Sequence, residues 1–200
     1  MTVDGTVTHE FAIPTPNTVT HRITTGPDGA LWFAEAGADK IGRLDLSTHA
    51  ITEFSLPNPT PGGRAPFDIV AGPDGNLWFT EIHSNKVGMI TTAGAITEFT
   101  VGDHPSMITA GPDGAVWFSE SDTEQASNPN KIGRISTDAS HTFTEFAPPT
   151  NDSKPQGITT GPDGALWFTE AIANKVGRSP PTAISANSPY RRRIRFRSAS

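Results

Sequence analysis

A histidine and a glutamate flank a tight turn near the start of the chain, at a spacing that could bring their side chains together. The stretch from His21 to Glu35 reads HRITTGPDGALWFAE, which predicts two short strands joined by a turn at GPDG. If the hairpin turns about 26–29, the two side chains face each other across the strands. A carboxylate in that position orients an imidazole ring or shares a metal ion with it. The pair is therefore a candidate for acid–base or metal chemistry.

The glutamate also has a structural interpretation, because it is repeated. A Glu stands two residues after a Trp-Phe pair at four places in the chain: Glu35, Glu81, Glu120 and Glu170. A carboxylate that recurs in this way could accept backbone N–H bonds from a neighbouring loop in every copy. That role is an alternative to catalysis for any one of the four.

Four further residues are candidates for substrate binding, since they fall in loops predicted for the same end of the hairpins. His83 and His104 are loop histidines that could contact a ligand. The stretch SDTEQASNPN, from Ser121 to Asn130, replaces a much shorter loop in the other copies, and long loops often carry function. Three other histidines lie near predicted outer strands and receive no role: His9, His49 and His141.

An internal repeat supplies the elements that must position these residues. The sequence ITTGPDGALWF occurs at 23–33 and is repeated without change at 158–168. Similar copies occur at 69–79 and 108–118. Each copy is followed by a segment such as NKIGRI, and the first three also by ITEF or FTEF. A period in the forties points to a repeat architecture.

Each repeat predicts four short antiparallel strands, which is typical of a β-propeller blade. The fold class expected is all-β, a propeller whose blades span 20–55, 66–100, 105–147 and 155–178. An isolated outer strand at 8–13 would complete the last blade. The repeated Trp is expected to fill the gap between neighbouring sheets. The 19 Gly and 18 Pro fit a chain of short strands and turns.

Composition narrows the classes of function. The chain has no Cys, which excludes disulfides and thiolate metal sites. It shows neither a signal-like N-terminus nor a long apolar run, so we expect a cytoplasmic protein without membrane or nucleic-acid partners.

The last 22 residues break the pattern. Residues 1–178 carry a net charge of −11, whereas 179–200 carry five Arg and no acid. Three interpretations compete for this tail: a disordered basic C-terminus, an arginine-rich arm, and a shifted reading frame. Reverse translation with a shift of one base gives ITTDGDLSEFSLPAPDSVPVGL, which resembles ITTAGAITEF at Ile90–Phe99. The comparison favours the frameshift over the arginine-rich arm.

The tandem pattern GPDGxLWFTE…NKIGRI…ITEF resembles the virginiamycin B lyase, or streptogramin lyase, family. The resemblance implies a seven-bladed propeller, of which this chain covers about four blades. It also implies a Mg²⁺-dependent carbon–oxygen lyase that linearises cyclic depsipeptide antibiotics of the streptogramin B class. A base removes a proton α to a carbonyl and the ester carboxylate departs, without consumption of water.

The same resemblance assigns catalytic roles to His21 and Glu35, with Glu35 also as metal ligand. Only the first inner strand has a His in this position; the others carry Phe67, Ser106 and Gln156. We therefore expect the chain to be a poor catalyst and to self-associate through exposed blade edges. A non-catalytic binding module is the alternative function, and a lactonase-type hydrolase is a weaker one.

Overall fold

The computed structural model describes residues 9–59, 63–121, 130–180 and 197–198, and all regular elements in these residues are strands. They form four antiparallel sheets, each with its strands in chain order. Blade 1 contains β1 (Thr20–Thr25), β2 (Leu31–Glu35), β3 (Lys40–Leu44) and β4 (Ile51–Ser55). Blade 2 contains β5 (Pro66–Ala71), β6 (Leu77–Glu81), β7 (Lys86–Ile90) and β8 (Ile96–Thr100). Blade 3 contains β9 (Pro105–Ala110), β10 (Ala115–Glu120), β11 (Lys131–Ser136) and β12 (Phe143–Phe146). Blade 4 contains β13 (Pro155–Thr160), β14 (Leu166–Glu170), β15 (Lys175–Ser179) and β16 (Arg197–Ser198).

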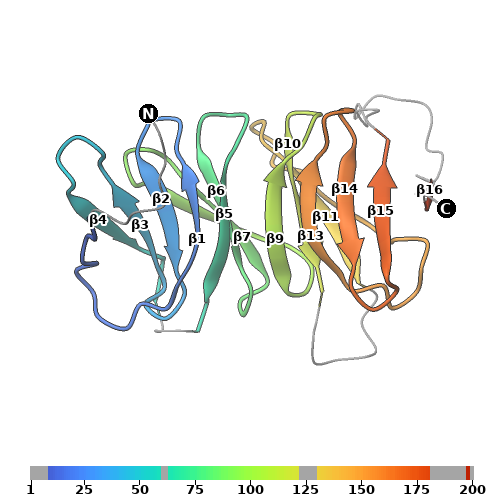
Figure 1. Cartoon of the computed structure of the whole chain (residues 1–200), viewed down its shortest axis with the longest axis horizontal. Helices are drawn as coiled ribbons and strands as arrows, with labels where there is room; N and C mark the ends of the chain where they lie inside the picture. Colours follow the sequence, from blue (N-terminus) through green and yellow to red (C-terminus); the bar gives the residue numbers. More distant parts are fainter. Residues whose placement is uncertain (1–8, 60–62, 122–129, 181–196, 199–200) are drawn as a thin grey trace.

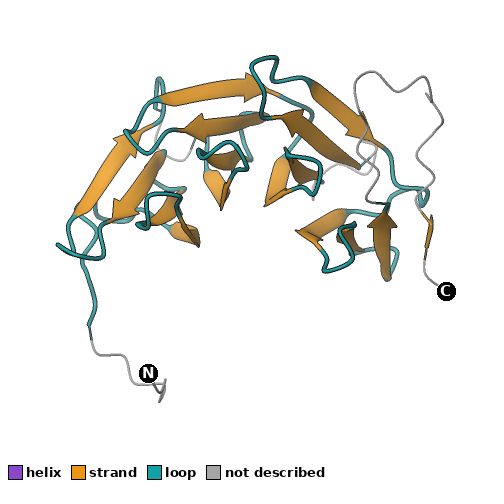
Figure 2. Cartoon of the chain, turned by 90° about the horizontal axis from the view of Figure 1, so that it is seen from above, coloured by secondary structure: helices purple, strands orange, loops and turns teal. Residues whose placement is uncertain are grey.

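The four sheets stand side by side along an open arc (Figure 2). The first strands of the blades, β1, β5, β9 and β13, are neighbours along this arc (Figure 1). Blades 1 and 4 lie at its two ends and do not meet. The all-β blade architecture expected from the repeat is thus confirmed.

The predicted outer strand at 8–13 is not formed in residues 9–13. This segment runs beside blade 1 instead of blade 4: Phe11 stacks on His49 with ring centroids 4.7 Å apart, and Thr15 Oγ1 donates to Glu53 Oε2 at 2.9 Å. A strand that closes a ring needs the last blade beside the first. In an open arc it has no such partner.

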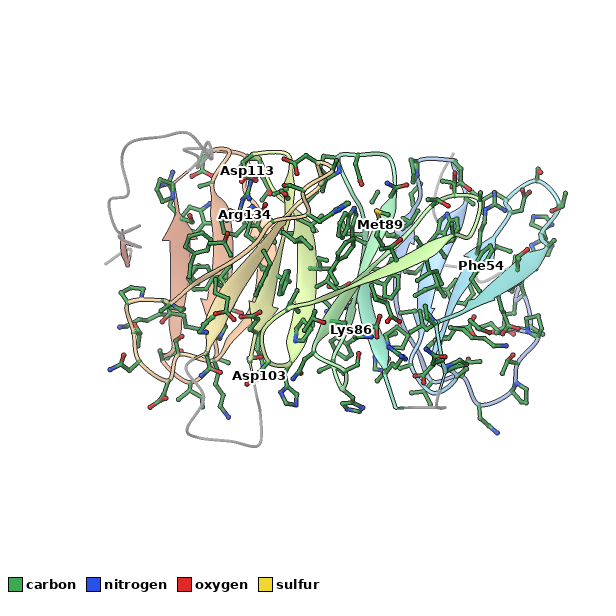
Figure 3. All side chains as sticks on the ribbon, turned by 180° about the vertical axis from the view of Figure 1, so that it is seen from behind. Phe54, Lys86, Met89, Asp103, Asp113 and Arg134 are labelled. Carbon is green, nitrogen blue, oxygen red and sulfur yellow. The ribbon has the colours of Figure 1, made fainter. Side chains whose placement is uncertain are left out.

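The turn GPDG is fixed by its aspartate, which binds the repeated Trp. In all four blades the Trp Nε1 donates to this carboxylate at 2.9–3.0 Å: Asp28, Asp74, Asp113 and Asp163. In blades 1, 3 and 4 an Arg from the third strand also donates to it, as Arg134 does to Asp113 (Figure 3). Burial opposes ionisation of Asp113, but the bonds from Trp117 and Arg134 outweigh it and lower the pKa of its carboxyl. The Asp is therefore a structural residue.

Two glycines of the repeat are required by close packing. A Cβ on Gly26 would lie 2.4 Å from the Trp32 ring, and a Cβ on Gly42 would lie 2.3 Å from the Phe33 ring. Equivalent clashes recur in the other three blades. The same residues therefore recur in the four repeats because each blade contains the same packing arrangement.

Each blade has two different faces, because side chains alternate along a strand. We call the side that carries the repeated Trp the Trp face, and the side that carries the following Phe the Phe face. Between blades 1 and 2 the Trp face of the first packs on the Phe face of the second, and Trp32, Ile41, Ile69 and Phe79 share one core cluster. The next two junctions repeat this arrangement.

Blade 4 departs from the pattern at its outer strand. The fourth strands of blades 1–3 have four or five residues, whereas β16 has two, Arg197 and Ser198, paired with Arg178 and Gly177. The remainder of the tail, 181–196 and 199–200, lies outside the described residues. Trp167 occupies the same position as the other three Trp residues, yet it is only partly buried because no further blade covers it.

Candidate functional site

His21 and Glu35 do not face each other, because the inner strand contains a bulge. The register of β1 and β2 pairs Ile23 with Phe33, but beyond the irregularity it pairs Thr20 with Glu35. His21 is exposed, and its ring lies 4.7 Å, centroid to centroid, from that of Phe67 in the next blade. The predicted pairing fails because an extra residue in one strand shifts every cross-strand neighbour after it.

Glu35 is instead enclosed within blade 1. Its side chain is 0% exposed, and neither carboxyl oxygen has a hydrogen-bond partner in the described structure. Burial, reinforced by the neighbouring Glu53 carboxyl, raises the pKa of Glu35 to about 7. Glu53 accepts from Lys40 Nζ at 3.2 Å and from Thr15. The result is a carboxyl pair, one member buried and one bound to a lysine.

The same combination of two Glu and one Lys occurs in the next two blades. Its members come from the second, fourth and third strands: Glu81, Glu98 and Lys86 in blade 2, and Glu120, Glu145 and Lys131 in blade 3. We call each set a Glu–Lys cluster. The clusters lie at the rim of the blades where the second strands end, and we call this rim the cluster end. In Figure 3 Lys86 lies toward this rim, and Asp113 lies at the other rim, where the GPDG turns are.

Each cluster also binds the loop that precedes its blade. Arg64 Nη1 donates to Glu81 at 3.3 Å and to Glu98 at 3.0 Å, and the Gly102 N–H donates to Glu120 at 3.1 Å. These bonds support the structural interpretation of the repeated Glu. A shallow cavity of about 350 Å³ adjoins the blade 2 cluster, lined by Asn58, Gly63, Arg64, Ser84 and Lys86.

In blade 4 the cluster is incomplete. The outer Glu stands opposite a glycine in blades 1–3, as Glu53 does opposite Gly42, whereas Gly177 is paired with Ser198. Glu170 Oε2 is buried and has no hydrogen-bond partner in the described structure. The sequence analysis did not identify the fourth-strand Glu and the third-strand Lys as members of a site. Both residues recur in each of the first three repeats, and this recurrence could have indicated them.

The described residues do not fit a magnesium site. No group of three His, Cys, Asp or Glu side chains gathers within them. Mg²⁺ prefers several oxygen ligands in octahedral geometry. Among the described residues, the carboxyl beside Glu35 belongs to Glu53, whose oxygens already accept from Lys40 and Thr15. We therefore derive no chemistry through a metal here.

Two of the four predicted substrate-binding residues are neighbours. The Ser121 N–H donates to the His104 carbonyl at 3.4 Å, and the His104 N–H donates to Asn85 at 3.1 Å. His104 Nδ1 and Asn130 Oδ1 are buried without a hydrogen-bond partner in the described structure. The loop between Ser121 and Asn130, 122–129, lies outside the described residues.

His83 lies on a loop of blade 2, and it is exposed. Its backbone N–H donates to the Arg64 carbonyl at 3.2 Å. This bond places the His83 loop at the cluster end, beside the loop that precedes blade 2.

A group of inner-strand residues was not foreseen. Asp68 accepts from the N–H of Ile69 at 2.9 Å and from that of Ile108, in the next blade, at 3.0 Å. Burial raises the pKa of Asp68, and the charge of Arg22 opposes that rise. Arg22 Nη2 in turn lies 3.4 Å from Met107 Sδ. Arg22, Asp68 and Met107 all lie within the irregular stretch of their inner strands, so only the observed register reveals that they come together.

Comparison with known proteins identifies the family of this chain. A sequence model described as the virginiamycin B lyase family matches residues 1–183. The chain belongs to this family. A comparison with curated proteins found no match.

Solved structures of virginiamycin B lyases agree with that assignment. The selenomethionine-substituted enzyme from Staphylococcus aureus is 43% identical, with a TM-score of 0.78 over 90% of this chain and 58% of that one. A catalytically inactive histidine-to-alanine variant of the S. aureus enzyme with quinupristin is 42% identical, with a TM-score of 0.78 over 89% and 57%. A streptogramin B lyase is 38% identical, with a TM-score of 0.76 over 88% and 56%. This chain therefore spans less than two thirds of the length of these virginiamycin B lyases.

More distant structures share the fold alone. A protein described as a putative gluconolactonase is 16% identical, with a TM-score of 0.64 over 92% of this chain. That similarity supports the propeller architecture and says nothing of the reaction. No helix capable of spanning a membrane occurs in the described part of the chain.

Proposed function

We propose that this chain is a lyase-family propeller segment that recognises cyclic depsipeptides of the streptogramin B class and opens their ring slowly. Membership of the virginiamycin B lyase family supports the reaction type. The observation that carries the low rate is the separation of His21 from Glu35: the histidine lies exposed beside Phe67, while the carboxyl is enclosed in its blade.

The chemistry proposed is elimination at an ester. A base takes the proton α to a carbonyl, the electron pair forms a carbon–carbon double bond, and the C–O bond breaks to release the carboxylate. His21 is the base that we propose, since imidazole is the side chain that most often serves as a general base and this one is open to solvent. We assign Glu35 to the structure of blade 1, although its catalytic role in the family resemblance stays a prediction. The Mg²⁺ requirement likewise stays a prediction.

Substrate contact is proposed along the first strands of the blades, β1 and β5, and at the cluster end. Phe67 beside His21 offers an apolar surface to a cyclic peptide. His83, His104, Ser121 and Asn130 are the loop contacts that we propose, since all lie at the end where His21 lies. The quinupristin complex of the S. aureus variant supports a small-molecule ligand.

Two further proposals concern the chain's surroundings. We propose that the protein acts in the cytoplasm, and that exposed blade surfaces allow copies to associate.

We expect the purified chain to give trace ring opening of a streptogramin B antibiotic, and His21→Ala to abolish it. Loss of a general base lowers a rate by about 10²–10⁴-fold. Gln156→Ala is the matched control, because Gln156 occupies the same position of β13, and it should leave the rate unchanged. Mass spectrometry of the product measures the reaction: elimination leaves the mass unchanged and creates an unsaturated end.

Other outcomes separate the alternatives. A product heavier by one water would identify a hydrolase of the lactonase type. Binding of the antibiotic without any product would identify a binding module. Turnover that survives His21→Ala would contradict the role of His21.

A further inference from the structure

The two ends of the arc expose apolar residues that are buried at every internal junction. On the Phe face of blade 1, Ile23 is 60% exposed, whereas Ile69 and Ile108, in the same position of blades 2 and 3, are 3% and 6% exposed. On the Trp face of blade 4, Val176 is 49% exposed, whereas Ile41 in the same position of blade 1 is fully buried. Within the described residues no further blade lies beside either face, which explains the exposure.

These two faces are the complementary halves of one interface. At each internal junction the Trp face of one blade meets the Phe face of the next, and the residues equivalent to Val176 and Ile23 share a core cluster: Ile41 with Ile69, then Val87 with Ile108. The free Trp face belongs to blade 4 and the free Phe face to blade 1. One chain therefore presents both halves, at opposite ends of the arc (Figure 2).

The charged groups near the free Trp face do not prevent such stacking. The Arg178 guanidinium lies 5.6 Å from the Trp167 ring centroid and is bound by Asp163 at 2.9 Å. The same group occurs in blades 1 and 3, where Arg43 lies over Trp32 and Arg134 over Trp117. Both of those faces are covered by the next blade, so a bound arginine is compatible with a packed junction.

We propose that a second copy of this chain is the partner of these faces: blade 4 of one copy stacks its Trp face on the Phe face of blade 1 of the other. The contact is head-to-tail, because it joins two different surfaces. It reproduces between chains the junction that each chain builds three times within itself. It specifies the surfaces used in self-association, and it does not depend on the proposed lyase activity.

Two substitutions, one on each face, test the proposal. Ile23→Asp places a charge on the Phe face of blade 1, and Val176→Asp places one on the Trp face of blade 4. Because an unpaired charge is costly in an apolar junction, each should raise the dissociation constant of self-association at least about tenfold. Both residues are largely exposed in the single chain, so neither change should disturb its fold.

Ile172→Asp is the matched control. Ile172 is 61% exposed and lies in the same blade as Val176, but in a loop position whose counterpart in blade 2, His83, stays exposed although that blade is covered on both sides. This variant should associate like the unmodified chain.

Mixing the two face variants gives the decisive measurement, by analytical ultracentrifugation at a series of concentrations. The Ile23→Asp chain keeps an intact blade 4 face and the Val176→Asp chain an intact blade 1 face, so an equimolar mixture should form dimers and nothing larger. A monomeric unmodified chain at hundred-micromolar concentration would overturn the proposal. So would face variants that associate as the unmodified chain does, or a mixture that stays monomeric.

Discussion

Replacement of Trp32 by Ala is expected to lower the free energy of unfolding by about 3–5 kcal/mol, as large aromatic-to-alanine changes in packed cores do. Trp32 is fully buried in the junction between blades 1 and 2. The substitution removes its apolar contacts there and also the bond from its Nε1 to Asp28. Chemical denaturation followed by circular dichroism measures the loss.

Trp167→Ala is the matched comparison and should cost only about 1–2 kcal/mol, because less surface is removed from a packed site. Trp167 makes the same bond to its Asp, at 3.0 Å, and carries the same stacked arginine as Trp32, but no blade covers it. The difference between the two variants therefore measures the inter-blade contact. Equal losses would contradict the assignment of the Trp to the blade junction.

Glu120→Gln is expected to make the protein more stable at pH 9, by on the order of 2 kcal/mol, and to have little effect at pH 5. Burial, together with the nearby Glu145 carboxyl, raises the pKa of Glu120 to about 8 in the folded chain. An unfolded glutamate has its ordinary pKa near 4.5. Between these values the folded chain binds the extra proton, so its stability falls as the pH rises.

The contribution of that proton is complete below pH 4.5 and is lost as the pH rises through about 8. A glutamine stays neutral throughout, and its amide oxygen can still accept from Gly102. Thermal unfolding from pH 5 to pH 9 checks the slope, with Glu10→Gln, an exposed position, as the control. A Glu120→Gln protein that is less stable than the unmodified chain at pH 9 would refute a protonated carboxyl in this cluster.

The repeat made the fold predictable because each repeated residue performs the same packing task in every blade. The first glycine of GPDG and the glycine of NKIGR lie where a Cβ would collide with a Trp or Phe ring, so their recurrence reflects a packing requirement. The strand order within a blade follows from short turns between neighbouring strands. Such local constraints are visible in a sequence.

The site was less predictable because it depends on register and on neighbouring blades. Because of a single bulge in β1, Thr20 and not His21 lies opposite Glu35, and no sequence pattern indicates the position of this bulge. Asp68 spans two blades by accepting from Ile108, a contact that no pattern within one repeat can indicate. The Glu–Lys clusters lie between these cases, since their recurrence was visible but their burial was not.

The most direct test of the account is the specific rate of ring opening of quinupristin, measured side by side for this chain and for the virginiamycin B lyase of S. aureus. In the part of the chain that the structure describes, His21 has no carboxylate opposite it and no group of metal-binding side chains gathers, and such groups individually contribute about 10²–10⁴-fold to a rate. We therefore predict a kcat/KM for this chain lower by at least about a hundredfold, with the mass of the product unchanged. A rate equal to that of the S. aureus enzyme would contradict the claim that this chain carries the scaffold of the family without its complete catalytic site.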